Sequence, residues 1–472
     1  MKLFKSYAAK SVLLAASLVL GATPFKAEAL KPVDGPGQHV VGHARVKIEL
    51  TSSLGMPRAI DVELWYPADR GKWKDASSTV YRSRLWGVPL NANFDALSSE
   101  TVSGLARDVG IKKGGRFPLV IHSHGNNNQP FDWAQILESV AGHGYVVAAP
   151  WHTNNTFDDL RVDQFNWQTG GNLACLTGLP GPCMDANGGR TIADRVLDLK
   201  AIADGLGAHL GGHVDSSRIA VVGYSRGGAT AMAAAGGSAV YGITAMDSRL
   251  KGIFSWSAGL APVVLPIDLN KVELPAVLVT SSGDAGVPAA LLKQYYDSMP
   301  SKNKGLYQLD NAVHLSGGSN FCNEMQAAAA IAQANPRAFM EYPFLAMLFL
   351  YPYAGTAYDY CDYSHFTTPT DVTAFVQAYA GTLPTPESVP NKLSTHDVVR
   401  ATQRLLLTFL DNVLSHNGKT KFWKEGFLDP EYALENEPAL LTAEASFLPK
   451  KVAKERYKTK QHGSSSADIM SP

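Results

Sequence analysis

Apolar residues along this chain form short runs that alternate with helix-type repeats. The short runs have the length and branched side chains of buried parallel strands, and they lie at residues 117–121, 144–150, 218–223, 252–256, 276–280 and 305–309. Between them, apolar positions three and four residues apart predict helices at residues 131–141, 192–206, 229–235 and 288–299. Strands that alternate with helices in this way predict an α/β fold with a mostly parallel, doubly wound sheet.

The pattern changes on either side of this region. Residues 45–50 and 59–66 alternate between apolar and polar positions, as half-buried strands do. Residues 397–414 return to a strong helical period and predict a last helix that docks on the sheet. Residues 327–355 are Ala-rich and then strongly aromatic. They are expected to form a helical cap or lid over the sheet, or alternatively to pack as ordinary core.

These patterns divide the chain into parts. We predict a signal peptide at residues 1–29, an α/β core at 30–316, a helical cap insertion at 317–395, a last core helix at 396–424 and a C-terminal extension at 425–472. The end of the extension is rich in Lys, Gly and Ser, and it is expected to be disordered.

The N-terminus has the three parts of a signal peptide. Lys2, Lys5 and Lys10 form a positive region, and residues 11–22 form a short apolar stretch. Residues 27–29 read Ala-Glu-Ala, the small-residue pattern that signal peptidase accepts. The alternative is an uncleaved N-terminal anchor. We therefore expect an exported protein, periplasmic or secreted, with no stable membrane span after cleavage.

Composition and charge narrow the possible partners. The 472 residues are 45% hydrophobic and 18% charged, as in globular proteins. The formal net charge is zero, and cleavage after residue 29 removes four basic residues and one acidic residue, which leaves about −3. The body of the chain contains no basic patch with interleaved aromatic residues, so no nucleic-acid partner is expected. The oligomeric state is left open.

All four cysteines follow the signal peptide. An even number of cysteines in an exported chain predicts disulfides. Cys175 and Cys183 flank a turn-rich stretch and are expected to pair, which leaves Cys322 and Cys361 as the second pair. Only proximity in sequence favours this arrangement, so all three connectivities stay open. Metal binding is less favoured because the chain has no CxxC motif.

The main chemical motif is Gly-Tyr-Ser-Arg-Gly at residues 223–227. It matches G-x-S-x-G and stands between a predicted strand and a predicted small-residue helix, which is the setting of a nucleophile elbow. Such a turn projects the serine hydroxyl from the carboxyl end of the sheet. We therefore predict Ser225 as a nucleophile; the alternative is a glycine-rich turn without a catalytic role.

A serine nucleophile needs a base and an acid that orients the base. Asp284 follows the strand at 276–280, and His314 follows the strand at 305–309. In this order, Ser–Asp–His, the two residues occupy loops at the same edge of the sheet as Ser225. The competing candidates are His365 and His396 for the base, and Asp247 and Asp310 for the acid.

The reaction also needs donors for a developing oxyanion. We expect the backbone N–H of Arg226, next to the nucleophile, and the backbone N–H of Asn126 after the strand at 117–121. His122 and His124 form an H-x-H pair at that strand end, which in another setting would bind metal. We expect them to brace the oxyanion loop instead, and we predict no metal and no cofactor.

Three segments resemble one branch of the α/β-hydrolase superfamily, which includes platelet-activating factor acetylhydrolase-like proteins and predicted dienelactone hydrolases. The matching segments are residues 117–125, 143–152 and 215–225. The resemblance implies the α/β-hydrolase fold with Ser225, Asp284 and His314 as a triad. Three departures stand out. Trp151 replaces a frequent acidic residue, the acid follows a later strand than in the acetylhydrolases, and the nucleophile is not the cysteine of dienelactone hydrolases.

The resulting functional prediction is a serine esterase. Its substrate is expected to be a small-molecule or lipid-like ester with an apolar or aromatic group, contacted by Trp151, His152 and Trp256. The alternatives are a lactonase, an amidase or an acyltransferase with the same triad, and a non-catalytic binding protein on the same fold.

Overall fold

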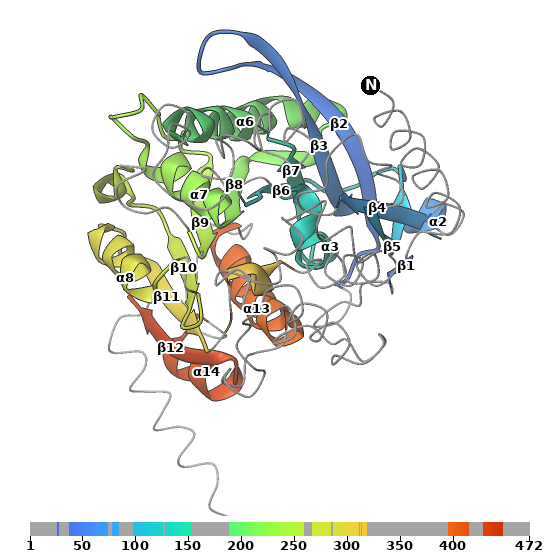
Figure 1. Cartoon of the computed structure of the whole chain (residues 1–472). Coiled ribbons are helices and arrows are strands. Elements are labelled where there is room, and N and C mark those ends of the chain that lie inside the picture. The colour runs from blue at the N-terminus through green and yellow to red at the C-terminus, as the bar shows by residue number, and fades with distance from the viewer. Residues whose placement is uncertain are drawn as a thin grey trace, which may run out of the picture.

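The computed structural model of the chain describes residues 26–27, 37–73, 78–84, 98–125, 128–152, 188–258, 267–284, 287–310, 312, 314–318, 395–414 and 428–446. Within these residues one large twisted sheet carries helices on both faces (Figure 1). The fold is therefore α/β with a mostly parallel centre, as the alternation of apolar runs predicts.

The sheet has the strand order β1-β5-β2-β3-β7-β6-β8-β9-β10-β11-β12, with β4 paired to β5. Its parallel centre consists of β7 (Val146–Pro150), β6 (Phe117–Ser123), β8 (Val214–Tyr224), β9 (Leu250–Trp256), β10 (Ala276–Ser281) and β11 (Lys304–Leu309). The chain passes from β6 to β7 on one side and then crosses to β8 on the other, so its winding reverses beside β6. Such a switch point, at the carboxyl ends of the strands, is where open α/β sheets bind ligands.

Further strands, most of them paired antiparallel, extend the sheet on both sides. The long hairpin of β2 (Val41–Thr51) and β3 (Pro57–Pro67) joins the centre through β7. Beyond it lie β5 (Ser98–Arg107), β4 (Ser78–Arg84) and β1 (Lys26–Ala27). At the opposite edge β12 (Leu440–Ala445) pairs with β11 and follows the short helix α14 (Pro430–Asn436). The strand β12 lies in the stretch that the sequence analysis treated as an extension, so this stretch contributes to the sheet.

Two helical layers cover the sheet. On one face lie α6 (Gly188–His209), α7 (Arg226–Gly236) and α8 (Ala289–Ser298), and on the other α3 (Ala134–Gly142) and α13 (Thr395–Leu414). The remaining short helices are α2 (Arg70–Trp73), η2 (Pro130–Trp133), η4 (Leu269–Lys271) and η5 (His314–Gly317). None of the helices in the described part of the chain has both the length and the apolar composition that a bilayer crossing requires.

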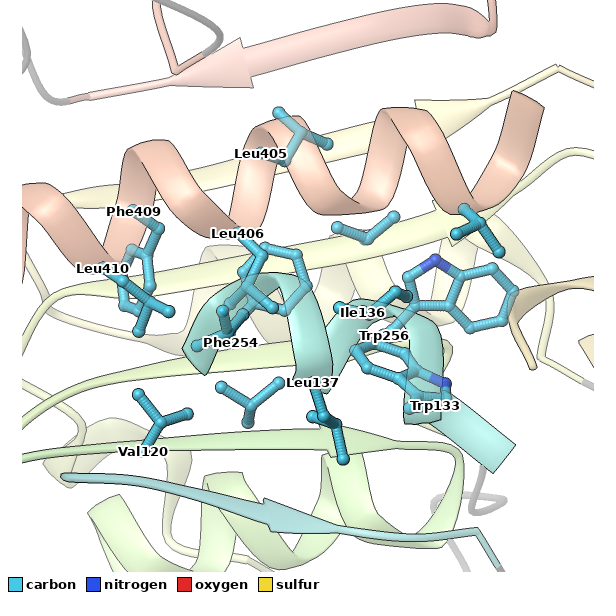
Figure 2. Close-up of a cluster of buried hydrophobic side chains, with 14 of the residues drawn as sticks. Val120, Trp133, Ile136, Leu137, Phe254, Trp256, Leu405, Leu406, Phe409 and Leu410 are labelled. Atoms are coloured by element: carbon cyan, nitrogen blue, oxygen red, sulfur yellow. The ribbon is translucent and has the colours of Figure 1, made fainter. Parts of the chain in front are cut away.

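The helix α13 docks on the sheet through its apolar stripe (Figure 2). Phe409 is fully buried, and its ring lies 6.1 Å from the ring of Phe254 on β9. Gly252 makes this approach possible, because a Cβ there would lie 2.7 Å from the Phe409 ring. Leu406 and Leu410 extend the same buried contact. The predicted docking of residues 397–414 is therefore observed.

The predicted strands and helices of the core are observed with boundary shifts of a few residues. Between residues 67 and 115, where the sequence analysis predicted no element, the structure has α2, β4 and β5. The four cysteines, the rival His365 and residues 319–394 of the predicted insertion lie outside the described residues.

Candidate active site

Ser225 occupies a sharp turn between β8 and α7. Its backbone has φ 55° and ψ −119°, a strained conformation for a residue with a side chain. A Cβ at position 227 would lie 1.7 Å from the carbonyl oxygen of Ser123, so only glycine fits there. The Ser225 N–H donates to the carbonyl of Trp256 on β9 at 2.9 Å, which ties the turn to the neighbouring strand. This is the geometry of a nucleophile elbow.

The structure brings Ser225, His314 and Asp284 into one hydrogen-bonded chain. His314 Nε2 lies 2.9 Å from Ser225 Oγ, and its Nδ1 lies 2.7 Å from Asp284 Oδ2. With Nδ1 as the donor to the carboxylate, Nε2 is left to accept the serine proton; this tautomer is assigned from the hydrogen bonds. The residues come from three loops at the carboxyl ends of β8, β10 and β11, as the sequence predicts.

Asp284 is suited to orient the histidine. Its side chain is fully buried, and that of His314 is 13% exposed. Burial alone would raise the pKa of Asp284, but the charge interaction with His314 and the hydrogen bonds from His314, Ser257 and Val287 together lower the pKa below its ordinary value. The Val287 N–H also donates to Asp284 Oδ1 at 2.9 Å. The acid is therefore held ionised with both carboxylate oxygens engaged.

Two hydroxyl groups donate hydrogen bonds to the loop that carries His314. The Tyr224 hydroxyl donates to the carbonyl of His314 at 2.9 Å, and the two rings lie 5.5 Å apart. The Ser281 hydroxyl donates to the carbonyl of Ala312 in the same loop. Tyr224 thus supports the base from the position directly before the nucleophile, a role that the G-x-S-x-G motif leaves unspecified.

Of the two predicted oxyanion donors, the structure describes Arg226 but not Asn126. Arg226 is the first residue of α7, where backbone N–H groups have no partner within the helix. Its guanidinium is largely buried, and burial lowers the pKa of Arg226 to about 10. Asn126 lies outside the described residues, which end on that side at Gly125.

The residues predicted to contact substrate occupy different environments. Trp256 and His152 are buried, so neither is exposed to a ligand. Both side chains pack in the interior, and the predicted substrate contact by these two residues is not observed. Trp151 is half-buried; its indole N–H donates to Glu63 at 2.8 Å, and Arg45 lies 5.1 Å over its ring. Of the three, Trp151 alone is partly exposed, and it directly follows the end of β7.

The H-x-H pair does not form a metal site in the part of the chain that the structure describes. His122 is buried and stacks on Trp133 with ring centroids 5.1 Å apart. The Nδ1 of His124 bonds the carbonyl of Gly125 at 2.8 Å. No group of three or more His, Cys, Asp or Glu side chains among the described residues is placed to hold a metal ion.

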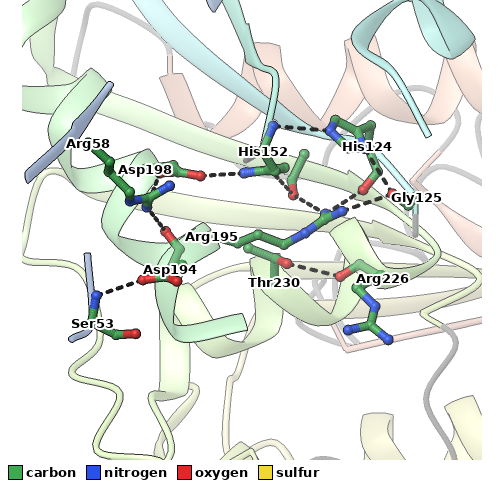
Figure 3. Close-up of polar contacts among 11 residues, drawn as sticks. Ser53, Arg58, His124, Gly125, His152, Asp194, Arg195, Asp198, Arg226 and Thr230 are labelled. Carbon is green, nitrogen blue, oxygen red and sulfur yellow. Dashed lines mark hydrogen bonds and ion pairs between the residues drawn. The ribbon is translucent and has the colours of Figure 1, made fainter. Parts of the chain in front are cut away.

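A buried polar cluster, which the sequence analysis did not find, lies behind the β6 loop (Figure 3). Arg195 and Asp198 of α6 meet His152, Ser123 and Arg58 there. A signal was present in the helical repeat, because position 195 falls three residues after Ile192 and four before Leu199, on the apolar face. A charged residue on such a face requires a buried partner.

Comparison with solved structures identifies the fold. A ferulic acid esterase from Streptomyces cinnamoneus matches 89% of this chain and 98% of its own, with a TM-score of 0.52 and 17% sequence identity. The chain has the α/β-hydrolase fold. A putative dienelactone hydrolase from Klebsiella pneumoniae subsp. pneumoniae MGH 78578 matches 63% of the chain and 98% of its own, with a TM-score of 0.34 and 14% identity. No protein-family model matches the sequence, and no curated protein matches it either.

The α/β-hydrolase fold explains where the site lies. In this fold the nucleophile, acid and base occur in that order along the chain, each after a strand, and converge at the carboxyl edge of the sheet. Ser225, Asp284 and His314 occupy those places beside the switch point next to β6. At the identities found, the comparison establishes the fold, and the chemistry must be argued from the residues.

Proposed function

We propose that this protein is an exported serine hydrolase that cleaves carboxylic esters through an acyl-enzyme on Ser225. The observation that carries the proposal is the continuous hydrogen-bonded chain from Ser225 through His314 to the buried Asp284. A strained serine beside an oriented imidazole is the arrangement that activates a hydroxyl for acyl transfer. Export is proposed from the signal-type residues 1–29.

The reaction follows from the positions of the atoms. Ser225 Oγ attacks the ester carbonyl while His314 Nε2 takes its proton. The N–H groups of Arg226 and Asn126 are proposed to stabilise the oxyanion. When the tetrahedral intermediate collapses, His314 returns the proton to the leaving alcohol, and the acyl group stays on Ser225. Water activated by His314 then releases the acid by the same steps in reverse. No step needs a metal or cofactor.

Two observations support an ester as the substrate. The fold is shared with a protein described as a ferulic acid esterase. The half-buried Trp151 lies at the end of β7, beside the switch point, where its face could contact an apolar or aromatic group of a small-molecule or lipid-like ester. Esters also make lower demands on leaving-group protonation than amides do.

The test is hydrolysis of p-nitrophenyl esters of increasing acyl length by the mature protein and its Ser225→Ala variant. Ser298→Ala is the matched control, because that hydroxyl bonds only the Gln294 carbonyl at the end of α8 in the described structure. We expect turnover by the wild type and the control and none by Ser225→Ala. Equal activity in Ser225→Ala would contradict the proposal. Activity confined to amides or lactones would keep Ser225 and replace the substrate class.

A further inference from the structure

A second Asp–His–Ser chain lies behind the β6 loop. Asp198 Oδ2 is 2.7 Å from His152 Nδ1, and His152 Nε2 is 2.9 Å from Ser123 Oγ. These distances equal those of the Asp284–His314–Ser225 set. The difference is access, because these three residues are at most 1% exposed. A substrate cannot reach Ser123, so this chain serves a purpose other than nucleophilic attack.

Arg195 connects this chain to the backbone of the β6 loop. The residue is 1% exposed and lies on α6, and its guanidinium donates to three oxygens of consecutive residues (Figure 3). These are Ser123 Oγ at 3.1 Å, the carbonyl of His124 at 2.5 Å and the carbonyl of Gly125 at 2.9 Å. A planar guanidinium with fixed donor directions is suited to hold two successive carbonyls at once.

The donors and acceptors along the chain form one consistent set. Since Arg195 can only donate, Ser123 Oγ accepts from it and gives its own hydrogen to His152 Nε2. His152 Nδ1–H then donates to Asp198, whose other oxygen accepts from Arg58 of β3. Burial and the charge of Arg195 hold the pKa of His152 well below its usual range, so the ring is neutral as this arrangement requires.

The Gly125 carbonyl is held by a second donor. The His152 backbone N–H points to His124 Nε2 at 3.4 Å, which leaves His124 Nδ1–H to donate to Gly125 O at 2.8 Å. A peptide group is planar and trans, so the direction of its C=O sets the opposite direction of its N–H. The direction in which the Gly125 carbonyl is held therefore decides the direction of the N–H on the other side of the same peptide group.

The same loop packs on the nucleophile elbow. A Cβ on Gly125 would lie 3.1 Å from the Tyr224 ring, and one on Gly227 would lie 2.8 Å from the His124 carbonyl. The loop therefore contacts residues on both sides of Ser225. Arg195 holds its carbonyls on the α6 side, so a change in that hold would move peptide groups next to the nucleophile.

We propose that Arg195 is a positioning residue for the oxyanion loop: backed by Asp198, His152 and Ser123, it fixes the His124 and Gly125 carbonyls and so orients the N–H after Gly125 toward the oxyanion. The inference rests on the proposed ester hydrolysis and deepens it. Arg195 touches neither substrate nor reacting atoms; it acts through the backbone.

The test compares Arg195→Met, Arg195→Lys and Ser123→Ala with the wild type. Three quantities are measured for each: kcat, KM, and the inhibition constant of an alkyl trifluoromethyl ketone, whose serine adduct places an oxyanion in the hole. Removing an oxyanion donor lowers kcat by about 10²–10³-fold, so a misdirected donor is expected to lower it by about 10–100-fold. Arg400→Gln on α13, which contacts Asp397 and Glu437, is the matched control.

We expect Arg195→Met to lose kcat and ketone affinity by similar factors with KM little changed, and Arg195→Lys to recover part of both. Ser123→Ala, which removes one hydroxyl from the chain, should show the same pattern at smaller size. A folded Arg195→Met with unchanged kcat and ketone affinity would overturn the inference. The inference would also be overturned if Arg195→Met lost activity only because it melts below the assay temperature. A change confined to KM would overturn it as well. Wild-type protein without ester turnover would instead overturn the proposed function, and the inference with it.

Discussion

Replacing Asp284 by asparagine keeps His314 in place but changes which of its ring nitrogens carries the proton. In the wild type, Asp284 Oδ1 accepts from the Val287 N–H and Oδ2 accepts from His314 Nδ1. An asparagine can keep its oxygen on Val287, and its NH2 group then faces Nδ1. His314 must accept that hydrogen bond on Nδ1 and carry its proton on Nε2. In this tautomer Nε2 cannot take the proton from Ser225.

The expected loss is large because the carboxylate is fully buried. The same substitution in a Ser-His-Asp protease lowers kcat by about 10⁴-fold through the wrong tautomer. Each factor of ten corresponds to about 1.36 kcal/mol, so the predicted rise in the activation free energy is about 5 kcal/mol. KM should change little, since Asp284 faces away from the acyl group.

The assay is kcat and KM for the best p-nitrophenyl ester at neutral pH. Asp310→Asn is the control. Asp310 directly follows β11, and its carboxylate accepts a long hydrogen bond, 3.4 Å, from the Ser282 hydroxyl. We expect Asp310→Asn to retain near wild-type turnover. The reasoning is refuted if Asp284→Asn keeps more than about a tenth of kcat, or if Asp310→Asn loses as much as Asp284→Asn.

Three further substitutions test the supports of the site and the fold. Tyr224→Phe removes the donor to the His314 carbonyl, worth about 0.5–1.5 kcal/mol, and should lower kcat about 2- to 10-fold; an unchanged kcat contradicts this support. Phe409→Ala should lower the free energy of unfolding, measured by urea titration, by about 3–5 kcal/mol. Leu406→Met, the control, should lower it by less than about 1.5 kcal/mol. Equal losses would contradict the contact between α13 and the sheet. Burial would raise the pKa of Asp215, but hydrogen bonds from its neighbours lower it from 3.8 to about 2. Ionised Asp215 therefore adds stability that is complete above about pH 4 and is lost as the pH falls through 2. Asp215→Asn should cost about 1 kcal/mol at pH 7 and only a small part of that at pH 2; a constant difference would contradict it.

The nucleophile and its partners could be predicted because their signals are local. Ser225 is marked by contiguous residues that must form a strained turn between a strand and a helix, and sterics allow few alternatives there. Asp284 and His314 follow apolar runs whose order fixes the edge of the sheet at which they emerge. The structure places the three side chains within hydrogen-bonding distance, as this order requires.

Other features depend on contacts between distant segments. Arg195 and His152 are 43 positions apart in the chain, and nothing local shows that both meet Ser123. Trp256 and His152 were expected to contact substrate, but both are buried. A position at or just after a strand end does not show whether a side chain points outward or packs inward. The strand β12 has no clear apolar pattern because only Leu440 in it is buried, so pairing with β11 decides its conformation.

The most direct test of the central claim is to locate the reactive serine by mass spectrometry after treatment with a fluorophosphonate. The account predicts one adduct per chain on the peptide that contains Ser225, formed in step with the loss of ester turnover and absent in Ser225→Ala. An adduct on another residue, or full inhibition without modification of Ser225, would contradict it.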